Sequence, residues 1–133
     1  MCFKGNAKGK MKFAFCGSLR DYCVSVGYAK GSPTRELALW DLRSPDERIC
    51  TNTYQGTSQA FVEYDEDSKL CCVTGKGDSG VEFSEFYQGA IYKSNRYSDN
   101  VGAKAQCKCP RRMVDYGDNE IMRYLRLGQN YIE

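Results

Sequence analysis

The sequence contains no histidine among its 133 residues. Histidine is the commonest general base and a frequent zinc ligand, and every Ser-His or Cys-His nucleophile pair requires it. Its absence argues against most hydrolase mechanisms and against mixed cysteine–histidine zinc sites. No pair of carboxylates stands out for acid–base chemistry either. We therefore predict a protein that is not an enzyme, with no catalytic residue, no cofactor and no metal site.

Long apolar runs are also missing. The first fifteen residues contain no signal-peptide core, and no stretch approaches the roughly 20 apolar residues of a membrane-spanning helix. We therefore expect a cytoplasmic protein without a membrane span. Its eight cysteines would then face a reducing compartment. We expect them to be free thiols, most of them packed as small hydrophobic side chains.

Neither sign of charge is in excess. Nineteen Lys and Arg residues against 17 Asp and Glu give a net charge of +2, spread along the whole chain. Nucleic-acid binding needs a concentrated cationic face, so we expect no nucleic-acid partner. The one local cationic group contains Lys104, Lys108, Arg111 and Arg112. The simplest interpretation is a solvated edge, and the functional alternative is a docking patch for an acidic partner.

The sequence is rich in short segments of Val, Phe, Tyr, Thr and Cys, bounded by Gly, Asn, Asp and Ser. This pattern predicts an all-β fold without helices. The predicted strands are Lys12–Cys16, Tyr22–Tyr28, Glu36–Leu42, Ile49–Tyr54, Ala60–Tyr64, Lys69–Thr74, Val81–Phe86, Ile91–Tyr97, Ala103–Cys109 and Ile121–Leu127.

These strands repeat as a unit. Corresponding strands begin at Leu37, Val81 and Ile121, which lie 44 and 40 residues apart. A four-stranded unit with this period is typical of WD-type β-propeller blades. We predict a partial propeller of about three four-stranded blades, in units of approximately 5–54, 55–99 and 100–133. Residues 37–42 are apolar at nearly every position, which favours a strand buried on both faces, although a β-sandwich strand is the alternative.

Four segments in this order resemble the later blades of the coronin family. They are Pro33–Arg43, Phe61–Ser68, Gly75–Ser79 and a tail formed by Cys109–Asp115 with Asn119–Leu127. The resemblance runs from about Gly5 to the last residue. It implies a WD-repeat β-propeller that binds actin filaments and actin-regulatory proteins and is located in the cytoplasm at the cytoskeleton.

The resemblance has two departures. Coronins have seven blades, so we expect the chain to represent a fragment, with self-association through its open blade faces; no actin-contact residue is carried over. Many WD blades also contain a hydrogen-bonded tetrad of Asp, His, Ser or Thr, and Trp. Here Asp78 has the required spacing to Val81, but the following Trp position holds Ser84 and Trp40 lacks a histidine partner. We expect these blades to rely on apolar packing, with Trp40 between blades, more than on a buried polar network.

Three other motifs are interpreted as structural. Gly75–Gly80 matches G-x-G-x-x-G, but a predicted strand follows it where a dinucleotide site needs a helix, so we predict a hairpin turn. Asp65–Asp67 lacks the glycine and glutamate of a calcium loop and is also predicted as a turn. In Ala103–Cys109 the alternate residues Ala103, Ala105, Cys107 and Cys109 share one face, which favours core packing over a thiolate metal site.

Two functions follow. The first is a non-catalytic actin-binding or cytoskeleton-organising module of the coronin type, and the alternative is a generic WD-repeat scaffold that does not bind actin.

The thiol state can be tested directly. Titration of the denatured protein without reductant is expected to count about eight free thiols. A count of four or fewer would overturn the cytoplasmic assignment.

Overall fold

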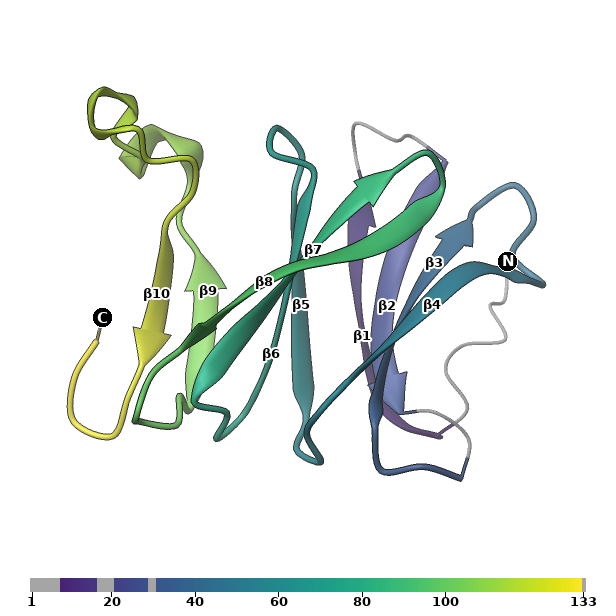
Figure 1. Cartoon of the computed structure of the whole chain (residues 1–133), viewed down its shortest axis with the longest axis horizontal. Coiled ribbons are helices and arrows are strands. Elements are labelled where there is room, and N and C mark those ends of the chain that lie inside the picture. Colours follow the sequence, from purple (N-terminus) through teal and green to yellow (C-terminus); the bar gives the residue numbers. More distant parts are fainter. Residues whose placement is uncertain (1–7, 17–20, 29–30, 133) are drawn as a thin grey trace.

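Ten β-strands in three antiparallel sheets make up the chain, seen in a computed structural model that describes residues 8–16, 21–28 and 31–132. The first sheet has the order β1-β2-β3-β4, the second β5-β6-β7-β8, and the third pairs β10 with β9. The sheets stand side by side in chain order (Figure 1). The strands are β1 (Lys8–Cys16), β2 (Tyr22–Tyr28), β3 (Arg35–Asp41), β4 (Arg48–Tyr54), β5 (Ala60–Asp65), β6 (Leu70–Gly75), β7 (Gly80–Tyr87), β8 (Ala90–Ser98), β9 (Ala105–Lys108) and β10 (Tyr124–Leu127).

The all-β class is confirmed, and a strand occurs in each of the ten predicted segments. The third sheet has two strands in the part of the chain that the structure describes, where the repeat predicts four. Between β9 and β10 lie two short 3-10 turns, η1 (Arg111–Met113) and η2 (Tyr116–Asp118). The division into three repeat units stays a prediction.

The main core lies between the first and second sheets. Alternate residues of β2 and β3 face the second sheet, and they meet the inward side chains of β5, β6, β7 and β8. Within this core the rings of Tyr64 and Phe86 pack edge to face with centroids 5.6 Å apart. The core residues are Val24, Val26, Leu37, Leu39, Tyr54, Ala60, Val62, Tyr64, Cys71, Val73, Phe86 and Ile91.

The remaining residues of β2 and β3 face the other side of the first sheet. Cys23, Ala38 and Trp40 form a separate buried cluster there. The near-continuous apolar pattern of β3 therefore reflects burial on both faces, as predicted. Trp40 points away from the second sheet, so the prediction that it packs between blades is not tested by the contact of these two sheets and stays a prediction.

Buried hydrogen bonds accompany this apolar packing, and the expectation that the blades rely more on packing than on a polar network stays a prediction. The indole Nε1 of Trp40 donates to Ser25 Oγ at 2.8 Å, and both side chains are buried. In the second sheet Ser84, which occupies the expected Trp position, is buried and hydrogen-bonded to the hydroxyl of Tyr54. Serine hydroxyls thus pair with the buried indole of Trp40 and the buried hydroxyl of Tyr54 without histidine.

A buried arginine connects the first two sheets. Arg35, at the start of β3, is 2% exposed, and its guanidinium pairs with Asp78 in the turn between β6 and β7. Nη2 also lies 3.1 Å from Asp78 Oδ1 and 2.8 Å from Ser58 Oγ, and Nε donates to the Ser58 carbonyl at 3.1 Å. This guanidinium holds together one strand, the linker to the second sheet and a turn of the second sheet.

Two glycines next to this guanidinium, Gly56 and Gly75, have no room for a side chain. A β-carbon at Gly75 or Gly56 would overlap the arginine head group, and Gly56 also has a positive φ of 124°. The turn that contains Asp78 is closed by Asp78 N donating to the Gly75 carbonyl at 2.9 Å. The predicted hairpin turn at Gly75–Gly80 is confirmed, and it additionally serves as the anchor point for Arg35.

Replacing Arg35 by leucine is expected to lower the free energy of unfolding by about 3–5 kcal/mol, because Asp78 and Ser58 lose a buried charged partner. The matched control is Arg48→Leu, which removes a pair with Glu36 whose arginine is 41% exposed; it is expected to cost about 0–1 kcal/mol. Urea unfolding followed by tryptophan fluorescence measures both. Equal losses would show that the Arg35 contact is no more than a surface ion pair.

Candidate functional site

The four cations proposed as a docking patch lie on and beside the third sheet. Lys108 comes from β9 and Arg111 from η1, and both point to Asp65 at the end of β5. Lys108 Nζ donates to Asp65 Oδ1 at 3.0 Å and to the Tyr64 carbonyl at 3.1 Å. Arg111 Nη2 lies 3.5 Å from Asp65 Oδ2, and its Nε contacts Asp67. Two of the four cations therefore join the third sheet to the second.

Asp65 is the centre of this junction and is 2% exposed. Burial alone would raise its pKa, but the backbone N–H and hydroxyl of Ser68 and the ammonium of Lys108 together hold the pKa at about 2. The Ser68 bonds are 3.0 and 2.7 Å long and close the turn between β5 and β6. The predicted turn at Asp65–Asp67 is confirmed, and its first carboxylate anchors Lys108 and Arg111.

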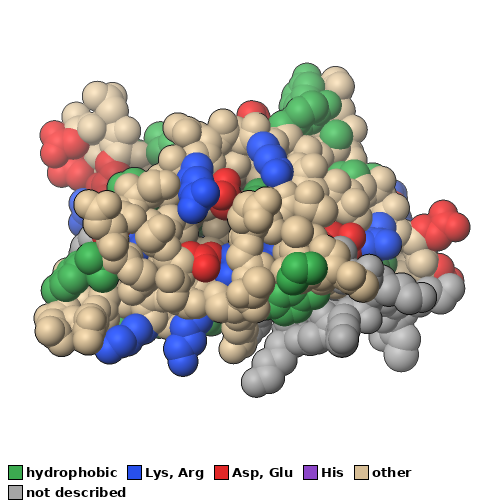
Figure 2. All heavy atoms as spheres, turned by 60° about the horizontal axis from the view of Figure 1, so that its bottom comes forward, with side chains coloured by type: hydrophobic (Ala, Val, Ile, Leu, Met, Phe, Trp, Pro, Cys, Tyr) green, Lys and Arg blue, Asp and Glu red, His purple; other side chains and the backbone are tan. Residues whose placement is uncertain are grey.

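The other two cations, Lys104 and Arg112, are exposed. Lys104 Nζ donates to the Gln129 carbonyl at 3.3 Å, a contact at the surface. Figure 2 shows Lys and Arg interspersed with Asp and Glu over one face of the molecule, with no continuous cationic area. The structure thus separates the four residues into two that hold the fold and two that face solvent, and a docking role stays a prediction.

Residues 103–109, which include β9, only partly face as expected. Ala103 and Cys109 are buried, but Ala105 and Cys107 are exposed. Lys108 points to the second sheet because Asp65 pairs with it there. The prediction that the whole Ala103–Cys109 face packs in the core is therefore wrong for its two central residues.

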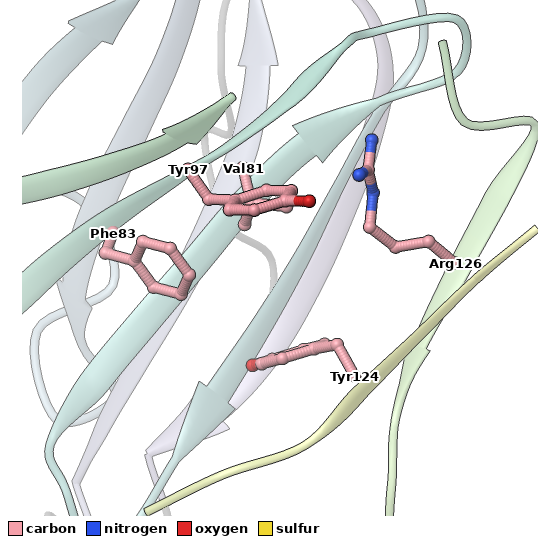
Figure 3. Close-up of a pocket in the computed structure, with 5 residues that line it drawn as sticks. All are labelled: Val81, Phe83, Tyr97, Tyr124 and Arg126. Atoms are coloured by element: carbon pink, nitrogen blue, oxygen red, sulfur yellow. The ribbon is translucent and has the colours of Figure 1, made fainter. Parts of the chain in front are cut away.

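A cleft of about 270 Å³ opens between the second and third sheets. Figure 3 shows Val81, Phe83 and Tyr97 lining one side, with Tyr124 and Arg126 of β10 on the other. The Arg126 guanidinium carbon lies 5.5 Å from the centre of the Tyr97 ring, and a nitrogen lies 3.6 Å from Asp99. The cleft is thus lined by three aromatic residues, one valine and one cation.

Tyr124, which lines this cleft, and Cys72, which is close to Tyr124, have raised pKa values. Burial raises the pKa of Cys72 to about 12, so this thiol stays protonated, and burial with the adjacent Cys72 also raises the pKa of Tyr124. Burial raises the pKa of Glu63 as well, but Glu63 does not line the cleft. Within residues 8–16, 21–28 and 31–132 no cluster of three acidic or cysteine side chains is arranged to hold a metal ion.

Backbone hydrogen bonds complete the junction between the second and third sheets. The amide of Gly77 donates to the Ala103 carbonyl at 2.7 Å, and the Ala103 amide donates to the Asp78 carbonyl at 3.0 Å. The same turn that receives Arg35 from the first sheet therefore pairs with the third. These contacts were not foreseen because sequence patterns do not show which distant turn meets which strand.

Comparison with known proteins identifies this arrangement of sheets. A scan against protein-family models finds no match. In structure, the chain superimposes on the WD40 domain of Toxoplasma gondii coronin with a TM-score of 0.87 and 25% identity, covering 96% of this chain and 33% of that one. The chain is coronin-like. Its sheets are blades of a partial WD-type β-propeller, which confirms the fold expected from the sequence.

Curated sequences agree with the structural match. The coronin-like chain is 24% identical to a coronin-like protein of Saccharomyces cerevisiae over 77% of its length, covering 16% of that protein. It is 26% identical to a coronin-like protein of Schizosaccharomyces pombe over 92% of its length and 24% identical to Coronin-A of Dictyostelium discoideum over its full length. It spans 20% and 29% of those two proteins. The chain therefore corresponds to less than a third of these relatives.

None of the described residues form a helix that is both long and apolar enough to cross a bilayer.

The depressed pKa of Asp65 predicts a pH dependence of stability. Its folded pKa of about 2 lies below the ordinary value of 3.8, so the stabilisation is present above pH 3.8 and is lost as the pH falls through about 2. After allowance for solvent screening, we expect a loss of about 1 kcal/mol across this window.

Urea unfolding between pH 5 and about pH 2 measures this loss. Asp65→Asn is expected to flatten the dependence, whereas the control Asp67→Asn, at a carboxylate that is 58% exposed, is expected to keep it. The same slope in both variants would place the titrating group elsewhere.

Proposed function

We propose that the chain is a non-catalytic, actin-filament-binding module of the coronin type that acts in the cytoplasm at the cytoskeleton. The observation that carries the proposal is the structural match to a coronin WD40 domain over 96% of the chain. Coronins, as the resemblance implies, bind actin filaments and actin-regulatory proteins. The aromatic cleft and the raised pKa values of Cys72 and Tyr124 support a binding role over a catalytic one.

The exposed cations offer a starting point for the contact surface. Actin filaments present acidic surfaces, and a basic patch on the module would steer association and respond to salt. Lys104 and Arg112 are exposed, whereas Lys108 and Arg111 are held by Asp65 and Asp67. We therefore propose that Lys104 and Arg112 contribute most of the patch's attraction, with Lys108 and Arg111 at its inner edge.

A second function is supported by the same geometry. Because Lys108 and Arg111 already have carboxylate partners inside the chain, less cationic surface is free for an acidic partner than the sequence suggests. The chain also spans only 16–29% of its curated relatives. Both observations favour a generic WD-repeat scaffold that binds a protein other than actin.

Co-sedimentation with filamentous actin distinguishes the two functions. The purified chain, first shown to be folded by a cooperative thermal transition, is expected to pellet with filaments and to do so less at high salt. A folded chain that stays in the supernatant at every filament concentration would support the scaffold function.

Charge reversal then tests the patch. The double variant Lys104→Glu, Arg112→Glu is expected to weaken filament binding about tenfold. The matched control is Arg43→Glu, Lys76→Glu, which reverses two exposed cations elsewhere and is expected to leave binding unchanged. An equal loss in both double variants would show a general charge effect without a patch.

A further inference from the structure

The outer strand of the second sheet is long and exposed. In the described part of the chain, β8 stands at the end of the order β5-β6-β7-β8, and it spans nine residues without a proline. Residues 92–98 are all exposed. The edge of such a strand can accept a further strand through main-chain hydrogen bonds. The edge of β8 is therefore a candidate site for an extended peptide segment.

The register shows which main-chain groups of β8 point away from β7. The amide of Phe86 donates to the Lys69 carbonyl at 3.2 Å, so the even-numbered residues of β7 bond toward β6. Their partners in β8 direct N–H and C=O groups outward; these partners are Ile91, Lys93 and Arg96. The Ile91 carbonyl accepts from Asn52 Nδ2 of β4 at 2.9 Å, which agrees with this direction. Beyond Ile91 the outward groups lie in the exposed part of the strand.

A bulge places two cations on the same face of β8. Lys93 pairs with Ser84. Arg96 pairs with Glu82, two positions earlier in β7, so Ser94 is the extra residue of the bulge. Side chains three positions apart point to opposite faces of a regular strand, but the extra residue brings Lys93 and Arg96 to one face.

This face is turned toward the first sheet. The ammonium of Lys93 lies 4.7 Å from the centre of the Tyr54 ring of β4. Arg96 is 51% exposed and lines a polar cleft of about 260 Å³ with Gln55 and Gly56, in the linker between the two sheets. The first and second sheets have four strands each. Both cations therefore lie where two four-stranded sheets meet, away from the third sheet.

The charges of β8 define the segment that would fit its edge. The strand contains two cations and no acidic residue. On its inner side Glu82 faces Arg96, with nitrogen and oxygen 3.4 Å apart. A regular strand added on the outer side would place residues two positions apart opposite Lys93 and Arg96, as β7 does on the inner side. The complementary segment therefore has carboxylates at alternate positions.

The same cations argue against a second copy of the chain at this edge. Cations on an edge strand prevent identical strands from pairing. Two β8 strands side by side would bring four cations together, and like charges opposite each other are destabilising. An acidic strand meets the opposite situation, because each carboxylate gains a cationic neighbour.

We propose that β8 binds an extended acidic segment of a partner protein by strand addition, with two alternate carboxylates of the segment opposite Lys93 and Arg96. The main chain of β8 supplies the hydrogen bonds, and the two cations select the sequence. This binding is independent of the proposed actin function and does not require the Lys104 and Arg112 patch.

Fluorescence anisotropy with labelled peptides tests the proposal on the full chain. The probe is a capped peptide as long as β8 in which glutamate alternates with threonine, and it is expected to bind. Replacing each glutamate by glutamine is expected to weaken binding about tenfold, because the charge pairs are lost. N-methylation of alternate amides keeps every carboxylate but removes main-chain donors, and it is expected to weaken binding at least about tenfold.

Charge exchange in the protein tests the two cations. The double variant Lys93→Glu, Arg96→Glu is expected to lose the glutamate peptide and to bind a peptide with lysine in place of glutamate. The variant Lys93→Gln, Arg96→Gln avoids a new repulsion with Glu82 and is expected to lose the glutamate peptide only. The matched control is Arg48→Glu, at an outer-strand arginine that also pairs with a glutamate, and it is expected to keep binding. Far-UV circular dichroism establishes that each variant is folded.

Several results would overturn the proposal. Equal binding of the N-methylated peptide would exclude strand addition, and equal binding of the glutamine peptide would exclude selection by charge. A loss in Arg48→Glu as large as in the double variants would show a general charge effect. Dimers in sedimentation equilibrium that the Lys93→Gln, Arg96→Gln variant no longer forms would assign the edge to a second copy. The assays contain no actin, so their failure leaves the actin proposal intact.

Discussion

The contact of Arg35 with Asp78 is the constraint that relates the blades to one another. Each four-stranded sheet is a series of hairpins that needs no information from its neighbour to pair its strands. Apolar packing brings two sheets together but has no directional preference. A planar guanidinium that binds a carboxylate, a hydroxyl and a carbonyl at once has a strong directional preference. It fixes the first sheet against the turn of the second.

The junction with the third sheet also has a charged anchor, but here the buried group is a carboxylate and its partners are cations. There the buried carboxylate of Asp65 receives Lys108 and Arg111, and the turn around Asp78 adds backbone hydrogen bonds to Ala103. Each interface thus combines an apolar or aromatic filling with one charged anchor at its edge. Beside the aromatic cleft, burial raises the pKa values of Cys72 and Tyr124.

The strands and turns were predictable from the sequence because their signals are local, such as the apolar run of β3 and the glycines of the turn at Gly75–Gly80. The face of the sheet to which an individual side chain points was not predictable from the sequence. A strand buried on both sides has no alternation to show which face meets which neighbour, so the sequence did not indicate that Trp40 points away from the second sheet. Cys107 and Ala105 were misjudged because small side chains fit a core or a surface equally well. Arg35 and Asp78 are 43 positions apart, and nothing in either segment indicates the other.

The space around Arg35 has a consequence for how this chain can change over generations. Gly75 must lack a side chain only as long as the guanidinium fills the volume beside it, whereas the positive φ of Gly56 favours glycine there in any case. While the arginine is present, any larger residue at Gly75 would be eliminated by selection for folding. Once the arginine has been lost, the same replacement becomes acceptable, and after it has occurred the arginine has no room to return. The order of substitutions is therefore not reversible, and lineages that drift past this point would build the blade junction in another way.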